Sequence, residues 1–248
     1  MAADSVKFEG FDRKGISFLK GIEKNNAKAW FEEHRDVYSE SLLAPMQRFF
    51  SALESVMLGI DPQFLADQRA GKGITRPHRD TRFSKDKSPY KSTIWLTYRR
   101  NVKDWQTYPA YYFEIMKDAY RYGVGFFMAE RSSMDTLRRI IDADPARIRR
   151  INTLVKKYGY TIEGDSYARP LKQLPDELAV WYNRKNVYLM HERRHDAALY
   201  SPAILDEVSA SFRALAPLYG LLMEAAEGKN RAADAVKIPL RERNTFDF

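Results

Sequence analysis

The chain has 248 residues, no cysteine and a formal net charge of +8 at pH 7. The missing cysteines exclude disulfides, thiol catalysis and cysteine-ligated metals, and they fit a reducing compartment. Because 44% of the residues are hydrophobic but no apolar run reaches membrane-spanning length, we expect a cytoplasmic protein with a substantial core, no membrane partner and a preference for anionic partners.

Helical periodicity dominates the first third of the sequence. An apolar stripe over residues 16–22 predicts a first helix that ends at Asn25-Asn26. The apolar residues between positions 30 and 38 also have helical spacing. Pro45 lies near the start of a further helix, and Asp61-Pro62 marks its end.

The helical periodicity of apolar residues stops after Asp61-Pro62, and a period of two begins near residue 94. Residues 66–92 contain glycines and prolines at irregular positions, so we predict a long ordered loop, a feature that is often functional. Apolar residues alternate with a period of two over residues 94–99, 111–116 and 120–128, which predicts three strands. Lys117-Asp118 is short enough to join the last two as a hairpin.

Helices return in the second half. Ser132-Ser133 and Asp144-Pro145 are predicted to begin two of them, and Gly159 to end the second. The other expected elements are short strands over residues 160–163 and 187–190 and a long helix over residues 205–218.

The order of these elements predicts the α+β class. We expect a single domain over residues 1–228, in which an antiparallel β-meander packs with N-terminal, middle and C-terminal helices. Residues 229–248 are expected to form a polar, loosely tethered tail.

The strongest functional signal is the segment from Arg76 to Lys91, inside the predicted loop. Its six Lys and Arg residues and two Asp residues give it a formal charge of +4. Clustered donors of this kind hold phosphates and carboxylates. We therefore predict a cationic pocket for a small anionic ligand, with these residues: Arg76, Arg79, Arg82, Lys87 and Tyr90 as ligand contacts, Asp80 orienting an arginine, and Phe83 anchoring the loop.

This segment, read as Arg76-x-x-Arg79-Asp80-x-Arg82-Phe83-x-x-x-Lys87-x-x-Tyr90, resembles the signature of the family called domain of unknown function 2461. Asn25-Asn26 followed by Trp30-Phe31 is similar to the opening of that family, and Gly123-x-Gly125 and Ala216-Pro217-Leu218 are similar to later features. The resemblance extends over most of residues 8–222. It implies no activity, cofactor or substrate.

Three other interpretations of the basic residues remain open. The arginines and aspartates of the segment could form only an internal brace, which would make the chain a structural module. An enzyme acting on the anion would use Asp80 and Glu114 as its carboxylates. Nucleic acid is the alternative partner, held by the basic loop with Arg99-Arg100 and further basic runs between residues 138 and 157.

Three short motifs carry less weight. His191-Glu192-Arg193-Arg194-His195 matches the H-E-x-x-H pattern of zinc peptidases, but it follows a strand-like run and no later histidine supplies a third ligand, so we predict a polar turn and no metal site. Gly71-Lys72-Gly73 lacks the spacing of a phosphate loop. Gly123-Val124-Gly125 lies inside a predicted strand, where a bulge or a close backbone approach explains it.

Overall fold

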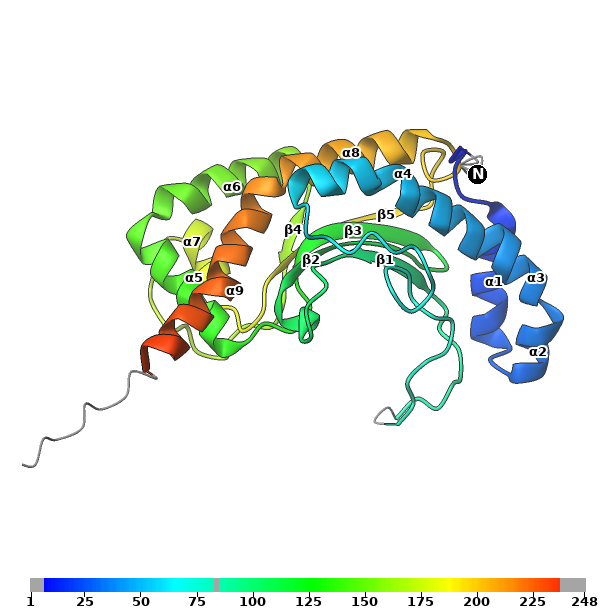
Figure 1. Ribbon diagram of the computed structural model, residues 1–248, viewed down its shortest axis with the longest axis horizontal. Helices are drawn as coiled ribbons and strands as arrows, with labels where there is room; N and C mark the ends of the chain where they lie inside the picture. Colours follow the sequence, from blue (N-terminus) through cyan, green and yellow to red (C-terminus); the bar gives the residue numbers. More distant parts are fainter. Residues whose placement is uncertain (1–6, 83–84, 237–248) are drawn as a thin grey trace, which may run out of the picture.

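The computed structural model describes residues 7–82 and 85–236, of which residues 229–236 are described by their backbone alone. In this part of the chain, one antiparallel sheet is covered on one face by helices (Figure 1). The predicted α+β class is confirmed.

The sheet has five strands in the order β1-β2-β3-β5-β4 within the described residues. Strands β1, β2 and β3 form the predicted meander, and β5 then adds to β3 and pairs with β4 on its other side. Met116 N donates to Ala119 O (2.9 Å), so Lys117-Asp118 forms the two-residue hairpin loop that the sequence predicts. The strand bounds are β1 (Ile94–Tyr98), β2 (Pro109–Ile115), β3 (Ala119–Phe126), β4 (Thr161–Glu163) and β5 (Tyr188–Arg194).

The helices fall into three groups along the sheet (Figure 1). Helices α1 (Arg13–Lys24), α2 (Lys28–Glu33) and α3 (Arg35–Val37) lie beyond one end of the strands, and the π-helical turn η1 (Tyr38–Leu43) leads from them to α4. Helices α4 (Ala44–Ile60) and α8 (Ala203–Ala214) pack together across the sheet. The third group packs around α9 (Ala216–Val236) and consists of α5 (Arg131–Ala143), α6 (Pro145–Lys157) and α7 (Asp176–Tyr182).

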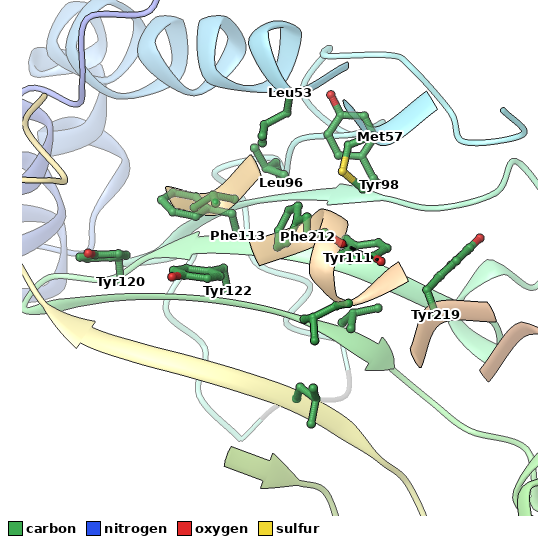
Figure 2. Packing of buried hydrophobic residues seen from close by; sticks show 14 of the residues in the cluster. Leu53, Met57, Leu96, Tyr98, Tyr111, Phe113, Tyr120, Tyr122, Phe212 and Tyr219 are labelled. Atoms are coloured by element: carbon green, nitrogen blue, oxygen red, sulfur yellow. Dashed lines mark hydrogen bonds between the residues drawn. The ribbon is translucent and has the colours of Figure 1, made fainter. Parts of the chain in front are cut away.

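The core lies between the sheet and the α4–α8 layer. Leu96, Tyr111 and Phe113 extend from the strands toward Leu53 of α4 and Phe212 of α8 (Figure 2). Alternate residues of β1 are buried, as expected for a sheet with one covered face.

Two buried tyrosines of this core donate their hydroxyls to backbone oxygens of the helices. Tyr98 Oη donates to Phe50 O (2.5 Å), and Tyr111 Oη donates to Phe212 O (3.2 Å). These bonds link the sheet to α4 and α8 and avoid the cost of burying an unpaired hydroxyl.

Helix ends follow the local sequence. The Asp144 carboxylate accepts from Arg147 N at the start of α6, with Pro145 in the first turn. Gly159 follows α6 with φ +65°, a left-handed conformation that glycine adopts without a steric cost.

Four elements differ from the sequence prediction. The single long helix expected over residues 205–218 is divided at Leu215 into α8 and α9. Helix α9 continues to Val236, whereas we expected the folded domain to end at residue 228; residues beyond 236 lie outside the described part of the chain. Strand β5 runs to Arg194, so the predicted polar turn at His191–His195 is wrong. Residues 191–194 are extended because they pair with β3, which is distant in the sequence, and local sequence patterns do not show such pairing. Helix α7, preceded by Pro175 and beginning with Asp176-Glu177, was not predicted.

A search of the described residues finds no helix with the length and apolar content needed to cross a membrane.

Candidate ligand-binding site

The loop between α4 and β1 first extends the sheet and then projects away from it (Figure 1). Thr75 N donates to Trp95 O (3.0 Å), and Thr97 N donates to Gly73 O (2.7 Å), so residues 73–75 run beside β1. Apart from isolated bridges, the described residues of the loop have no regular structure, as predicted.

The basic segment forms two arms that bond to each other. Arg79 N donates to Pro89 O, and Lys91 N donates to Pro77 O (both 2.8 Å). Phe83, predicted as the anchor of the loop, falls outside the described residues.

Tyr90 attaches this loop to the N-terminal helices. Its backbone N donates to Asn26 Oδ1 and its backbone O accepts from Asn26 Nδ2 (both 2.9 Å), and its ring stacks on Phe31 at 4.3 Å and 5°. Tyr90 is only 3% exposed, which suits an anchor better than the ligand contact that we predicted. Two features that resemble the family, the Asn-Asn…Trp-Phe opening and the arginine segment, are therefore in contact.

We expect Asn26→Ala to destabilise the protein by about 2 kcal/mol, since it removes two hydrogen bonds from a half-buried site. Urea unfolding measures the loss, and hydrogen exchange at the Tyr90 amide reports whether the loop has separated from α2. Asn25→Ala is the matched control, because Asn25 is exposed and its side chain only donates to Gly21 O (3.2 Å). Equal destabilisation by both variants would contradict the anchoring role.

Asp80 and Arg82 form an ion pair at the surface. Arg82 donates to the Asp80 carboxylate through Nε (3.0 Å) and Nη2 (2.7 Å), and these bonds lower the pKa of Asp80 to about 2. The two side chains are 58% and 77% exposed. Asp80 is therefore an ionised partner of one arginine, and a carboxylate with so low a pKa is a weak general base.

The other cations of the segment also bond within the loop. Arg79 Nη1 lies 2.7 Å from Asp86 Oδ2, and Lys87 Nζ donates to Thr81 O (2.8 Å). Arg79 Nε is buried and has no hydrogen-bond partner among the described residues.

Arg76 is placed differently, at the edge of the sheet. A side chain at Gly71 would collide with its guanidinium, because a Cβ there would lie 2.2 Å from Arg76 Nε. Burial, followed by the charges of Arg79 and Arg76, lowers the pKa of Lys91, whose Nζ donates to Arg76 O and His78 O. The charges of Arg76 and Arg79 therefore act on the ammonium group of Lys91.

The sheet face opposite the helices carries polar and aromatic side chains in register. Trp95 of β1 is paired with Glu114 of β2, and Glu114 is paired with Arg121 of β3. In the next row, Thr97 is paired with Tyr112.

This face borders a cavity of about 690 Å³, which is within the range of small-molecule sites. Residues 71–75 of the loop contribute to its wall, whereas the described residues between 76 and 91 do not. Most of the lining is aromatic or polar and includes Trp95, Trp105, Tyr112, Phe126, Phe127 and Tyr188.

Arg99 is a buried, charged residue in the lining of this cavity. It is 9% exposed, and its guanidinium carbon lies 4.2 Å from the centre of the Trp105 ring. Within the described residues Arg99 forms no ion pair, and its Nε has no hydrogen-bond partner. Burial lowers the pKa of the Arg99 guanidinium from its ordinary value, although arginine stays charged at neutral pH.

Glu114 lies in the same cavity. Its Oε2 accepts from Arg121 Nε (2.7 Å), and its side chain is 12% exposed. Arg121 is also paired across the sheet with Glu192, and both carboxylates raise the pKa of its guanidinium against the effect of burial. Of the two carboxylates predicted for catalysis, Glu114 is thus the one inside a cavity.

Gly123 and Gly125 allow β3 and β5 to approach closely. A Cβ at Gly123 would lie 1.9 Å from Leu189 O, and one at Gly125 would lie 2.3 Å from Tyr188 Cα. The close backbone approach that we predicted for these glycines is confirmed, and Gly125 borders the cavity.

The H-E-x-x-H residues have structural partners. His191 Nδ1 is 3.0 Å from Gly159 O, and His195 Nε2 is 3.0 Å from both Met116 O and Ala119 O at the hairpin. His195 also borders a second, open cavity of about 870 Å³ beside α1. Among the described residues there is no group of three or more His, Cys, Asp or Glu side chains that is arranged to hold a metal ion.

Several of the basic side chains considered for nucleic acid instead face protein carboxylates. These ion pairs are Arg100 with Asp61, Arg138 with Asp135, Arg147 with Glu224 and Arg149 with Glu177. Such pairing reduces the positive potential that these residues offer to a phosphate backbone.

Our prediction of ligand contacts did not include Arg99. A signal was present in the sequence: Trp95 and Thr97 occupy the alternate positions of β1 that do not face the core, and Arg99 continues this alternation one residue beyond the strand. An outward strand face that combines an aromatic with a cation is unusual for a surface in contact only with water.

A comparison with known protein families identifies the family of this chain. The sequence profile of a family described as conserved hypothetical protein (DUF2461) matches residues 14–220, which include the loop and the whole sheet. A comparison with curated proteins finds no match. The chain therefore belongs to the DUF2461 family.

Proposed function

We propose that the protein binds a small molecule with a carboxylate or phosphate group in the cavity on the open face of the sheet. The observation that carries this proposal is Arg99, a buried cation without a counter-ion among the described residues, inside a cavity of about 690 Å³. An uncompensated buried charge destabilises a protein, and an anion bound beside it offsets that cost. The cysteine-free composition fits a cytoplasmic location, which we also propose.

The aromatic lining supports a ligand with an apolar body. Trp95, Trp105 and Tyr188 line the cavity, and Phe127 is 66% exposed beside Trp105, at 6.2 Å between ring centres. Aromatic walls with a few polar groups are typical of sites that bind small organic molecules.

Binding can be tested with 4-(4-methylphenyl)butyrate and its neutral amide, observed through the indole N–H signals in NMR spectra. The chain has four tryptophans, of which Trp95 and Trp105 border the cavity, while Trp30 on α2 and the fully buried Trp181 on α7 serve as internal references. We expect the carboxylate to shift the signals of Trp95 and Trp105 and the amide to bind at least tenfold more weakly.

The Arg79→Gln variant is the control for location, because Arg79 lies outside the cavity. It should keep the carboxylate affinity of the natural protein. Loss of binding in Arg79→Gln, equal affinity for carboxylate and amide, or no shift of Trp95 and Trp105 would each overturn the proposal.

A further inference from the structure

The two ends of the cavity differ in charge. Arg99 and Glu114 border it from separated positions, because Glu114 is paired with Trp95 of β1, and Arg99 follows the end of that strand, four residues after Trp95. Four residues of extended chain span about 13 Å between backbone positions, and the arginine and glutamate side chains can each cover part of that distance, so a ligand of roughly 10 Å can contact both.

The end at Glu114 offers a carboxylate to the cavity. One guanidinium, Arg121, is paired across the sheet with two carboxylates, those of Glu114 and Glu192. Arg121 bonds to Oε2 of Glu114, and no donor among the described residues reaches Oε1. This oxygen is an acceptor that a hydrogen-bond donor on a ligand can use.

The end at Arg99 has the opposite character. Arg99 has no carboxylate partner among the described residues, and Lys72 also borders the cavity. Tyr112 lies between the two ends, and its hydroxyl is engaged with Leu189 O (3.1 Å), which leaves its ring as an apolar surface. The middle of the cavity therefore matches an apolar body.

From this polarity, and resting on the proposed function, we infer that the ligand is an elongated molecule with two different ends. Its anionic group lies at Arg99, and a hydroxyl, amine or amide donor about 10 Å away bonds to Glu114. This class includes ω-amino and ω-hydroxy carboxylates with an aromatic or aliphatic spacer. It excludes ligands with an anion at both ends, because the second anion would face the Glu114 carboxylate, which lines the cavity.

The test compares two probes that differ in one group. 4-(4-aminophenyl)butyrate carries a donor at the end opposite its carboxylate, and 4-(4-methylphenyl)butyrate has a methyl group of similar size there. We expect the amino compound to bind the natural protein about tenfold more tightly, because a hydrogen bond to a charged acceptor contributes more than a neutral one.

The matched variant removes the acceptor without leaving a lone charge. Glu114→Leu combined with Arg121→Met replaces both partners of the pair, a change that folded proteins tolerate far better than the loss of one partner. In this double variant the two probes should bind with equal affinity, and the methyl compound should keep the affinity that it has for the natural protein.

The outcomes separate this inference from the proposed function. If the methyl compound binds through Arg99 but the amino compound has no advantage, or keeps its advantage in the double variant, the inference is overturned and the proposed function stands. If neither compound binds, both are overturned.

Discussion

Replacing Arg99 with Met is expected to lower the affinity for 4-(4-methylphenyl)butyrate about 100-fold without lowering the stability of the protein. A buried, charge-assisted contact with a carboxylate contributes roughly 2–5 kcal/mol when one partner is truncated, and 100-fold corresponds to about 2.7 kcal/mol. The free protein should become more stable by about 1 kcal/mol, because the variant no longer buries a charge without a counter-ion. A Met side chain retains a favourable contact with the Trp105 ring in place of the cation–π contact.

This combination distinguishes a binding residue from a brace. A brace residue stabilises the free protein, so its removal lowers the melting temperature, whereas a residue kept for a ligand costs stability until the ligand binds. Calorimetric titration and thermal unfolding of the same sample measure both quantities. Arg99→Lys should show intermediate affinity, since lysine keeps the charge but loses the planar fork. A clear drop in melting temperature for Arg99→Met would contradict the proposed role.

The largest stability effect is expected at Asp61, which follows α4. This carboxylate is 4% exposed and joins three parts of the chain: Tyr219 Oη of α9 donates to it (2.5 Å), Arg100 Nε beyond β1 donates to it (2.7 Å), and Gln63 N donates to it (2.9 Å). Asp61→Ala leaves the Tyr219 hydroxyl and part of the Arg100 charge without a partner. We expect a loss of about 3 kcal/mol in the free energy of unfolding.

The same site makes stability depend on pH in a defined direction. Burial by itself raises the pKa of Asp61, but the bonds from Tyr219, Arg100 and Gln63 outweigh it and hold the pKa below its ordinary value of 3.8. As the pH falls below that value, the unfolded chain takes up a proton before the folded protein does, so stability is lost progressively toward lower pH.

Urea unfolding between pH 7 and pH 2 measures both effects. The contribution of Asp61 should be complete at neutral pH and absent in Asp61→Asn, whose stability should fall less steeply with acid. Asp80→Ala is the control, because the loss of its solvent-exposed pair with Arg82 should leave stability nearly unchanged. An identical acid response in the natural protein and in Asp61→Asn would show that another group governs it.

The candidate site was only partly predictable. The sequence drew attention to the segment from Arg76 to Lys91, where the charges of Arg76 and Arg79 act on Lys91, and to Glu114, which borders the cavity. It assigned ligand contacts to Arg79 and Arg82, which pair with Asp86 and Asp80, and whether those cations also bind a ligand stays a prediction.

The sequence by itself determined the elements and their class. A period of two marks β1 to β3, Lys117-Asp118 marks the hairpin, and Asp144-Pro145 marks the start of α6, because burial on one face and local backbone geometry act between near neighbours in the chain.

Only the tertiary structure decided which polar groups meet. Arg99 and Glu114 border the same cavity because β1, which Arg99 directly follows, pairs with β2, and Arg99 has no ion-pair partner among the described residues. Asn26 and Tyr90, 64 residues apart, bond because α2 packs against the loop. Such pairings depend on register and packing between distant segments, which local periodicity does not encode.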